Sequence, residues 1–237
     1  MANPNSKWYP YVKVQEGFYD ASDSDELLRK IMDYLLDMPD GSGYTPKDDN
    51  AYPRCRLWKL LYYDGARPTE NPLPTPAQKK SVLFDPELAE KPPTEKGYRL
   101  FPQIYSKPAQ ENAQTRIYCY LGRPVAEDDF TLQLSIIFDI WTNYTQESNT
   151  KLNEAYSRTW SMVQCLIQAF HGVNMAGVGT FYFNRSRHPD CGTVPLNDRQ
   201  DNVGYSLTMG LELKSTTLNG PEENNEVKIG NSGLSLG

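Results

Sequence analysis

The sequence predicts an α+β fold in which an antiparallel β-sheet is packed by two helices. Residues Phe130–Ile140 alternate between apolar and polar side chains, which is typical of a strand with one buried face. Residues 150–171 instead repeat their apolar side chains every three or four positions, as one face of a helix does. A second alternating run follows at Tyr205–Lys214. A helix lying across one face of an antiparallel sheet is the simplest way to bury these side chains.

An N-terminal helix is predicted to begin near Ser22 or Ser24. Serine and acidic residues suit a helix start, because their oxygens accept hydrogen bonds from the exposed amides and complement the positive end of the helix dipole. The helix is expected to end before Pro39. Its buried face is predicted to consist of Leu27, Leu28, Ile31, Met32, Leu35 and Leu36.

Residues 39–124 form a long proline-rich insertion, which holds thirteen of the 18 prolines. Since proline removes a backbone donor, we expect much of the insertion to be extended loop. Within it, Arg56–Tyr63 is predicted to form a strand. A second strand is predicted at Thr115–Leu121, pairing with 130–141 through a turn at Gly122–Asp129.

The central helix and the strands after it are marked by turn residues. Asn149 or Thr150 is the expected N-cap, and Gly172 suits the left-handed position after the helix. A strand is predicted at Gly179–Arg185, followed by a polar connection over 186–204.

The chain is expected to form a single α+β domain over 1–214, with the 39–124 insertion inside it. The first twenty or so residues are polar with aromatics and predict an irregular arm. Residues 215–237 are rich in Gly, Asn, Ser and Glu, which predicts a flexible C-terminal tail.

Composition excludes several classes of protein. The chain has 237 residues and a formal net charge of −6, which disfavours nonspecific binding to nucleic acid. No apolar run reaches the roughly 18 residues of a membrane helix, and no signal peptide is recognisable, so synthesis in the cytoplasm is expected. The four cysteines are scattered without a Cys-x-x-Cys pair. We therefore predict no disulfide scaffold, no metal site and no cofactor.

Two histidines are the first candidates for chemistry. His188 and Cys191 form a His-x-x-Cys pair in a loop, which fits a nucleophile pair, half of a metal site, or ordinary loop residues. No further His or Cys and no orienting group lies nearby in sequence, which favours ordinary loop residues. His171 follows the central helix, where a positive or hydrogen-bonding side chain suits the exposed carbonyls.

Glycines and carboxylates give no stronger signal. Gly172–Gly179 connects a helix to a strand, whereas a phosphate-binding loop connects a strand to a helix. The carboxylates Asp128, Asp129, Asp139 and Glu147 fit a solvated turn and a sheet face better than an acid–base pair. The sequence therefore predicts no catalytic residue and a protein that is not an enzyme.

Aromatic residues of the insertion are the candidate interface. Arg54, Arg56 and Lys59 are interleaved with aromatics, which fits a nucleic-acid platform or, given the net negative charge, an acidic protein neighbour. Large apolar side chains in loops require a partner to cover them. The predicted subunit or partner interface consists of Trp58, Tyr62, Tyr63, Phe84 and Tyr105.

The order of predicted elements resembles the tail-terminator and tail-completion (neck) proteins of long-tailed bacteriophages and related tail-like particles. The segments that carry the resemblance are Glu26–Met38, Phe130–Trp141, Leu152–Phe170 and Tyr205–Lys214. The 39–124 insertion is longer than a typical member carries.

The resemblance implies a virion structural protein in the tail or neck. Such proteins form a homo-oligomeric ring, usually of six subunits, that terminates the tail tube and joins it to the head-side connector. The implied partners are other copies of the chain, the tail tube protein and the head–tail connector protein. DNA would pass through the lumen without specific binding, which an acidic surface favours. No membrane partner is implied.

Three alternatives remain open. Another neck or tail-tube component would share the acidic character and the arms. A non-viral α+β ligand- or peptide-binding module would use the aromatics of Trp58–Tyr63 and Phe181–Phe183 as a pocket. An enzyme would use His188 and Cys191.

Overall fold

The structure is a computed structural model, and it describes the chain in segments. The described residues are 21–36, 52–63, 71–84, 97–103, 115–126, 131–143, 157–175, 179–197 and 202–214. All of them belong to one compact unit, Ala21–Lys214. The predicted N-terminal arm and the predicted flexible tail at 215–237 lie outside the described residues.

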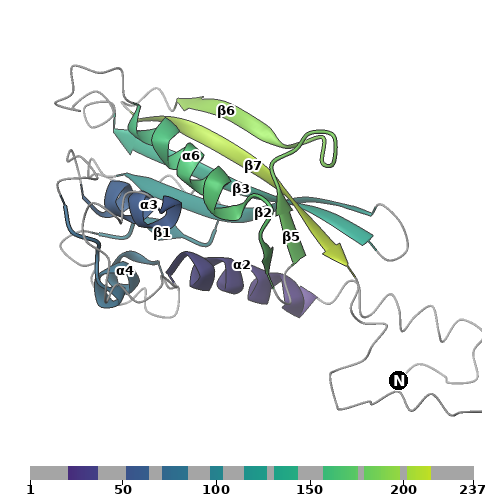
Figure 1. The fold of residues 1–237 in the computed structure, drawn as a ribbon, viewed down its shortest axis with the longest axis horizontal. Coiled ribbons are helices and arrows are strands. Elements are labelled where there is room, and N and C mark those ends of the chain that lie inside the picture. The colour runs from purple at the N-terminus through teal and green to yellow at the C-terminus, as the bar shows by residue number, and fades with distance from the viewer. Residues whose placement is uncertain are drawn as a thin grey trace, which may run out of the picture. The chain divides into compact units, whose positions relative to one another are not determined.

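A seven-stranded sheet forms the centre of this unit (Figure 1). Six strands follow the order β1-β2-β3-β7-β5-β4, and β6 also pairs with β7. The predicted α+β class is confirmed. Every pairing between these strands is antiparallel except β1 with β2, which is parallel, so the sheet is mixed. The strands are β1 (Leu100–Phe101), β2 (Arg116–Ala126), β3 (Thr131–Asn143), β4 (Asn174–Met175), β5 (Gly179–Tyr182), β6 (Gly192–Asn197) and β7 (Asn202–Lys214).

The long strand β7 joins the two halves of the sheet. One edge pairs with β3 along its whole length, from Asn143↔Asn202 to Thr131↔Lys214. The other edge is shared, because β6 pairs with the first half of β7 and β5 pairs with Gly210–Glu212. The chain between β5 and β6 must therefore leave the sheet and return to it at the same edge.

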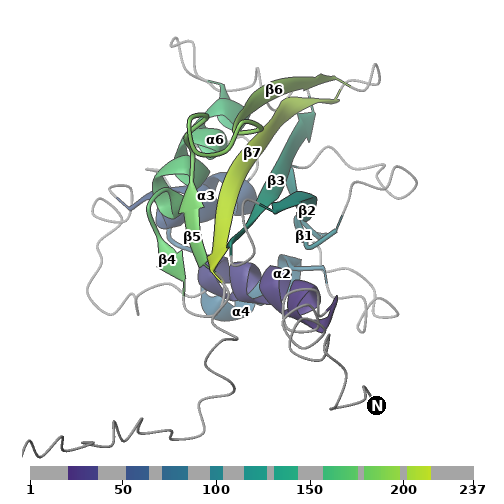
Figure 2. The same cartoon turned by 90° about the vertical axis from the view of Figure 1, so that its right-hand side faces the viewer.

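The helices in the described segments are α2 (Ala21–Leu36), α3 (Pro53–Tyr62), α4 (Pro76–Val82) and α6 (Arg158–Phe170). Helix α6 contacts β3 and β7, and α3 packs against α6 on the same side of the sheet (Figure 2). The α2 helix is tied to α6 where the Tyr34 hydroxyl donates a hydrogen bond to the Ala169 carbonyl, at 2.8 Å. The described part of the chain thus has four helices, compared with two in the prediction.

The core lies between the sheet and these helices. The side chains of Leu134, Ile136, Phe138 and Ile140 on β3 point into it, and cross-strand partners continue the same face, as in Cys119↔Phe138↔Leu207. Phe170 of α6 contacts three other rings, with centroids 5.1 Å from Tyr34, 5.4 Å from Phe138 and 5.0 Å from Phe181. The alternation predicted for 130–140 is therefore confirmed over the side chains that are described, Gln133–Ile140, and so is the buried face of α2, with Leu27, Ile31, Met32 and Leu35 buried.

The prediction of a strand at Arg56–Tyr63 is wrong, because Arg56–Tyr62 belong to helix α3 and Tyr63 is its C-cap. Pro53 occupies the first turn, where its missing N–H is not needed. Seven residues of the helix are buried, including Lys59. Polar and apolar residues therefore do not separate into an exposed and a buried face along this sequence. For a short apolar run that is buried on all sides, periodicity does not distinguish a strand from a helix. Thr75 and Gln78 form a reciprocal capping box at α4, so the insertion also contains regular structure beyond the predicted loop.

Three element boundaries also differ from the prediction. Helix α6 begins at Arg158 with Ser157 as its N-cap, whose hydroxyl accepts a hydrogen bond from Trp160 N at 3.1 Å; the predicted caps Asn149 and Thr150 lie outside the described residues. The predicted turn at 122–129 starts too early, because β2 continues to Ala126 after a register shift. The predicted polar connection 186–204 contains β6, where Pro195 is tolerated since the strand pairs on one side.

Two buried arginines fasten the C-terminal end of α3. Arg158 donates hydrogen bonds from its guanidinium to the carbonyls of Leu60 and Tyr63, and its Nε donates to Thr115 Oγ1 at 3.1 Å. Arg99 donates to the Leu61 carbonyl at 2.9 Å. Helix ends carry carbonyls without helical partners and a partial negative charge, which these cations neutralise. The arginines thereby join α3 to α6 and to the sheet.

Candidate functional site

The predicted interface residues are largely covered by their own chain. Trp58 is 1% exposed, and its indole N–H donates a hydrogen bond to the Leu35 carbonyl at 2.6 Å. Tyr62 is buried and meets the half-buried ring of Tyr63 edge-on, at 4.9 Å. Phe84 stacks on Phe101, with centroids 5.4 Å apart.

This packing removes the reason for expecting a partner at these positions. Trp58 and Tyr62 do not need another chain to shield them from water, because their own chain already buries them. Phe84 is partly covered in the same way, and Tyr105 lies outside the described residues. A role of these five residues in an interface stays a prediction.

The face of the sheet opposite α6 carries a buried polar row. Tyr118, Asp139 and Ser206 are cross-strand partners on this face. Asp139 is 9% exposed, and the Tyr120 hydroxyl donates a hydrogen bond to its Oδ2 at 2.9 Å. Burial, then this hydrogen bond and the negative charge of Asp139, raises the pKa of Tyr120. Asp139 thus acts as an acceptor within the sheet face, and its cross-strand partners Tyr118 and Ser206 supply no second carboxylate for acid–base work.

Residues 183–191, the β5–β6 loop, form a turn that is held by hydrogen bonds and by side chains buried against the sheet. Asn184 starts a turn in which its carbonyl accepts hydrogen bonds from Arg187 N at 3.1 Å and His188 N at 2.9 Å. Its side-chain oxygen accepts a third, from Ser186 N at 2.9 Å. After the turn, the side chains of His188 and Cys191 are buried against the sheet.

His188 lies in the space that Gly210 leaves on β7. A Cβ atom at Gly210 would be 2.6 Å from the Cβ of His188, so only glycine fits beneath the imidazole. The Nε2 atom of His188 lies 3.5 Å from the Ser135 hydroxyl. Cys191 contacts the Tyr182 carbonyl at 3.4 Å, and its sulfur accepts a hydrogen bond from Gly210 N at 3.2 Å. Both residues are anchors of the loop in this geometry.

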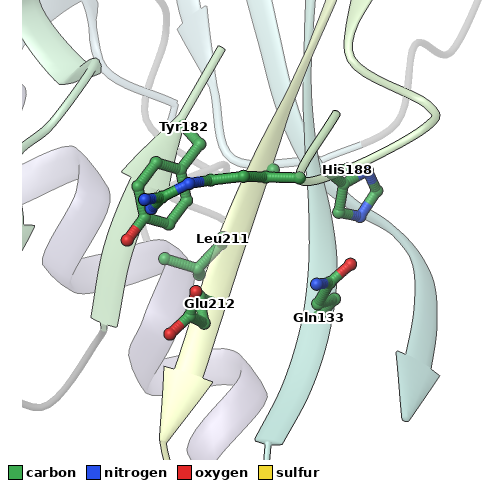
Figure 3. Close-up of a pocket in the computed structure, with 7 residues that line it drawn as sticks. Gln133, Tyr182, His188, Leu211 and Glu212 are labelled. Atoms are coloured by element: carbon green, nitrogen blue, oxygen red, sulfur yellow. The ribbon is translucent and has the colours of Figure 1, made fainter. Parts of the chain in front are cut away.

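A shallow hollow lies beside the β5–β6 loop (Figure 3). Its open and enclosed space together amount to ≈ 180 Å³, and the enclosed part has room for about one water molecule. Sites for small molecules usually exceed about 300 Å³, so the hollow is too small for a substrate. It is lined by Gln133, Tyr182, Arg187, His188, Gly210, Leu211 and Glu212.

All four cysteines are buried free thiols. Burial raises the pKa of Cys119, and it raises the pKa of Cys165 to about 11 although Arg56 opposes the shift. The thiolate is the reactive form. We expect Ellman's reagent at pH 8 to detect almost no fast-reacting thiol in the native protein and four thiols in guanidinium chloride. One fast-reacting native thiol that is lost in Cys191→Ser would contradict the anchoring role of Cys191.

Among the described residues, no group of three or more His, Cys, Asp or Glu side chains is placed to hold a metal ion. The helices that the structure describes include none long and apolar enough to cross a membrane.

Sequence reasoning did not single out the β5–β6 loop as a unit. Its polar composition and Pro189 read as a connection, and the sequence signal for its turn is Asn184, since asparagine side chains accept bonds from backbone amides two residues on. The pairing of His188 with Gly210 joins positions 22 residues apart, and only the strand register brings them together.

The sequence of the chain matches one protein family. Residues 55–210 match the family YomW, and the match covers about two thirds of the chain. The chain belongs to the YomW family. YomW is a phage-associated family, so the phage part of the resemblance is supported. The matched range extends from α3 to Gly210 and includes α6 and the β5–β6 loop. No curated protein and no solved structure matches the chain.

Proposed function

We propose that this chain is a phage structural protein that forms a ring, usually of six copies, at the end of the tail tube. The observation that carries the proposal is membership of the phage-associated YomW family over residues 55–210. The ring would join the tail tube protein to the head–tail connector protein and belong to the tail or neck of the virion. The ring is proposed to act as a structural joint with a channel, without catalysing a reaction.

The fold and the charge of the chain support this proposal. A mixed sheet with helices packed on one face gives a compact α+β unit of the kind that a ring subunit needs. The net charge of −6 would let DNA pass through the lumen without being held by Lys and Arg contacts to phosphate. The small hollow beside the β5–β6 loop gives no support to the alternative of a small-molecule binding module.

The proposed function predicts a specific assembly defect. Inactivating the gene in the phage or prophage that encodes the chain is expected to leave unjoined heads and tails of irregular length, because no ring would end the tube. Electron microscopy of lysates, with the gene restored in trans as the control, measures this. Normal virions in the absence of the protein would refute the proposal. Stalled assembly without tails would instead favour a tail-tube component.

A further inference from the structure

The β5–β6 loop presents two arginines on a preorganised turn. Asn184, Arg185, Ser186 and Arg187 are exposed, whereas His188 and Cys191 are each 2% exposed. Exposed loops without such anchors sample many conformations, and fixing each residue costs about 1–2 kcal/mol in backbone entropy. Here the three hydrogen bonds to Asn184 and the two buried anchors have already fixed the turn.

The anchoring is costly for the fold. The Nδ1 atom of His188 is buried and has no hydrogen-bond partner among the described residues, and such an orphan group costs about 1–3 kcal/mol. Gly210 sits in the interior of a long strand, where glycine is unfavourable. Features that lower stability while fixing an exposed loop are typical of binding positions.

Arg187 is held in an orientation that suits a carboxylate. Its guanidinium carbon lies 4.3 Å from the centroid of the Tyr182 ring, so the cation rests on the aromatic face. A stacked guanidinium keeps its in-plane N–H donors available, and that fork matches the two oxygens of a carboxylate. Tyr182 and Glu212 both line the hollow, and Figure 3 shows Glu212 below the ring of Tyr182.

The charges around the loop favour a carboxylate over a polyanion. Within residues 183–191, Arg185 and Arg187 outnumber the one carboxylate, Asp190, and Glu212 lines the adjoining hollow. Nucleic acid is bound through many phosphates at once, and so small an excess of positive charge cannot neutralise them. Individual carboxylates on a protein surface require only one or two arginines.

We propose that the β5–β6 loop is a contact between copies of this chain, in which Arg185 and Arg187 bind carboxylates of the neighbouring copy. Each copy has a net charge of −6, so copies packed side by side repel unless opposite charges meet at the interface. The arginines of the β5–β6 loop supply the positive charge that can meet carboxylates of the acidic neighbouring copy. The inference rests on the proposed ring and names one of its contacts.

The test measures self-association of the full chain by sedimentation equilibrium at low and high salt. The double variant Arg185→Gln/Arg187→Gln is expected to weaken association by about tenfold or more, because it removes charge-assisted hydrogen bonds. The wild-type association should weaken with salt, which screens exposed pairs. Arg123→Gln is the matched control, since Arg123 is an exposed arginine of β2 outside the loop.

A second variant tests the orientation of Arg187 separately from its charge. Tyr182→Leu keeps both arginines and removes the ring beneath Arg187, so we expect a smaller loss of association, of a few-fold. Circular dichroism verifies the fold of each variant.

Three outcomes would overturn the inference. They are a wild-type chain that stays monomeric at every concentration, a double variant that associates like Arg123→Gln, and tighter binding of a 20-base-pair DNA duplex than of a second copy. None of these results decides the virion experiment, which can still support a ring assembled on the tail tube.

Discussion

Replacing Arg158 with methionine is expected to lower the free energy of unfolding by about 2–4 kcal/mol. The guanidinium donates to the carbonyls of Leu60 and Tyr63 and to the Thr115 hydroxyl, and methionine leaves these buried acceptors without that donor. Arg158 is 1% exposed, so water cannot replace the lost bonds without opening the contact between α3 and α6. Urea unfolding followed by circular dichroism measures the change.

The position of Arg158 makes this a sharp test. It is the first residue of α6, where the helix dipole disfavours a positive charge, so its stabilising contribution comes from its hydrogen-bond partners and not from the dipole of its own helix. Arg123→Met serves as the control, because Arg123 is exposed and a surface substitution is expected to change stability by less than about 0.5 kcal/mol. Equal midpoints for the two variants would show that the Arg158 bonds do not hold the helices together.

Gly204→Ala is expected to destabilise the sheet by about 3 kcal/mol or more. A Cβ atom at Gly204 would lie 1.8 Å from the carbonyl oxygen of Ile140 and 2.9 Å from its carbonyl carbon. Both atoms belong to the backbone of β3, so the β3–β7 pair must separate locally to admit a methyl group, and misfits of this kind are among the few that cost so much. Thermal and urea unfolding measure the effect.

Gly192→Ala provides the matched comparison. Gly192 also lies in a strand of this sheet, yet nothing lies within 4 Å of the position of its Cβ atom. Alanine restricts the unfolded chain, so Gly192→Ala is expected to leave stability unchanged or to raise it by about 0.4–1 kcal/mol. If both alanine variants unfold at the same urea concentration, the close approach of Gly204 to Ile140 does not constrain the sheet.

Local sequence determined the long strands and the amphipathic helix. Strand β3 was predicted almost to its ends because Phe138 and its even-numbered neighbours face the core while Gln133 and Ser135 do not. Helix α2 was predicted for the same reason, since its apolar side chains recur about every 3.6 residues, whereas those of a strand recur every two. Patterns of this kind exist wherever an element turns an apolar face toward the core and a more polar face away from it.

Elements buried on every side, or held by distant residues, were not predictable in this way. The residues of helix α3 were predicted to form a strand because they lack the exposed polar face by which a helix is recognised in a sequence. Even Lys59 is buried there, together with Leu57 and Leu60. Lysine is buried there only because the tertiary structure surrounds it. The capping box of Thr75 and Gln78 is a local signal that the prediction overlooked.

The sequence by itself determined the α+β class, the strand–helix–strand order and the absence of a strong catalytic motif. The tertiary structure alone decided which polar residues act together. The bonds of Arg158 to Leu60 span 98 positions, and the fit of His188 over Gly210 depends on the register of β7. Such contacts have no local signature, because the hydrogen bond and the steric fit act through space and the chain separation between the partners is arbitrary.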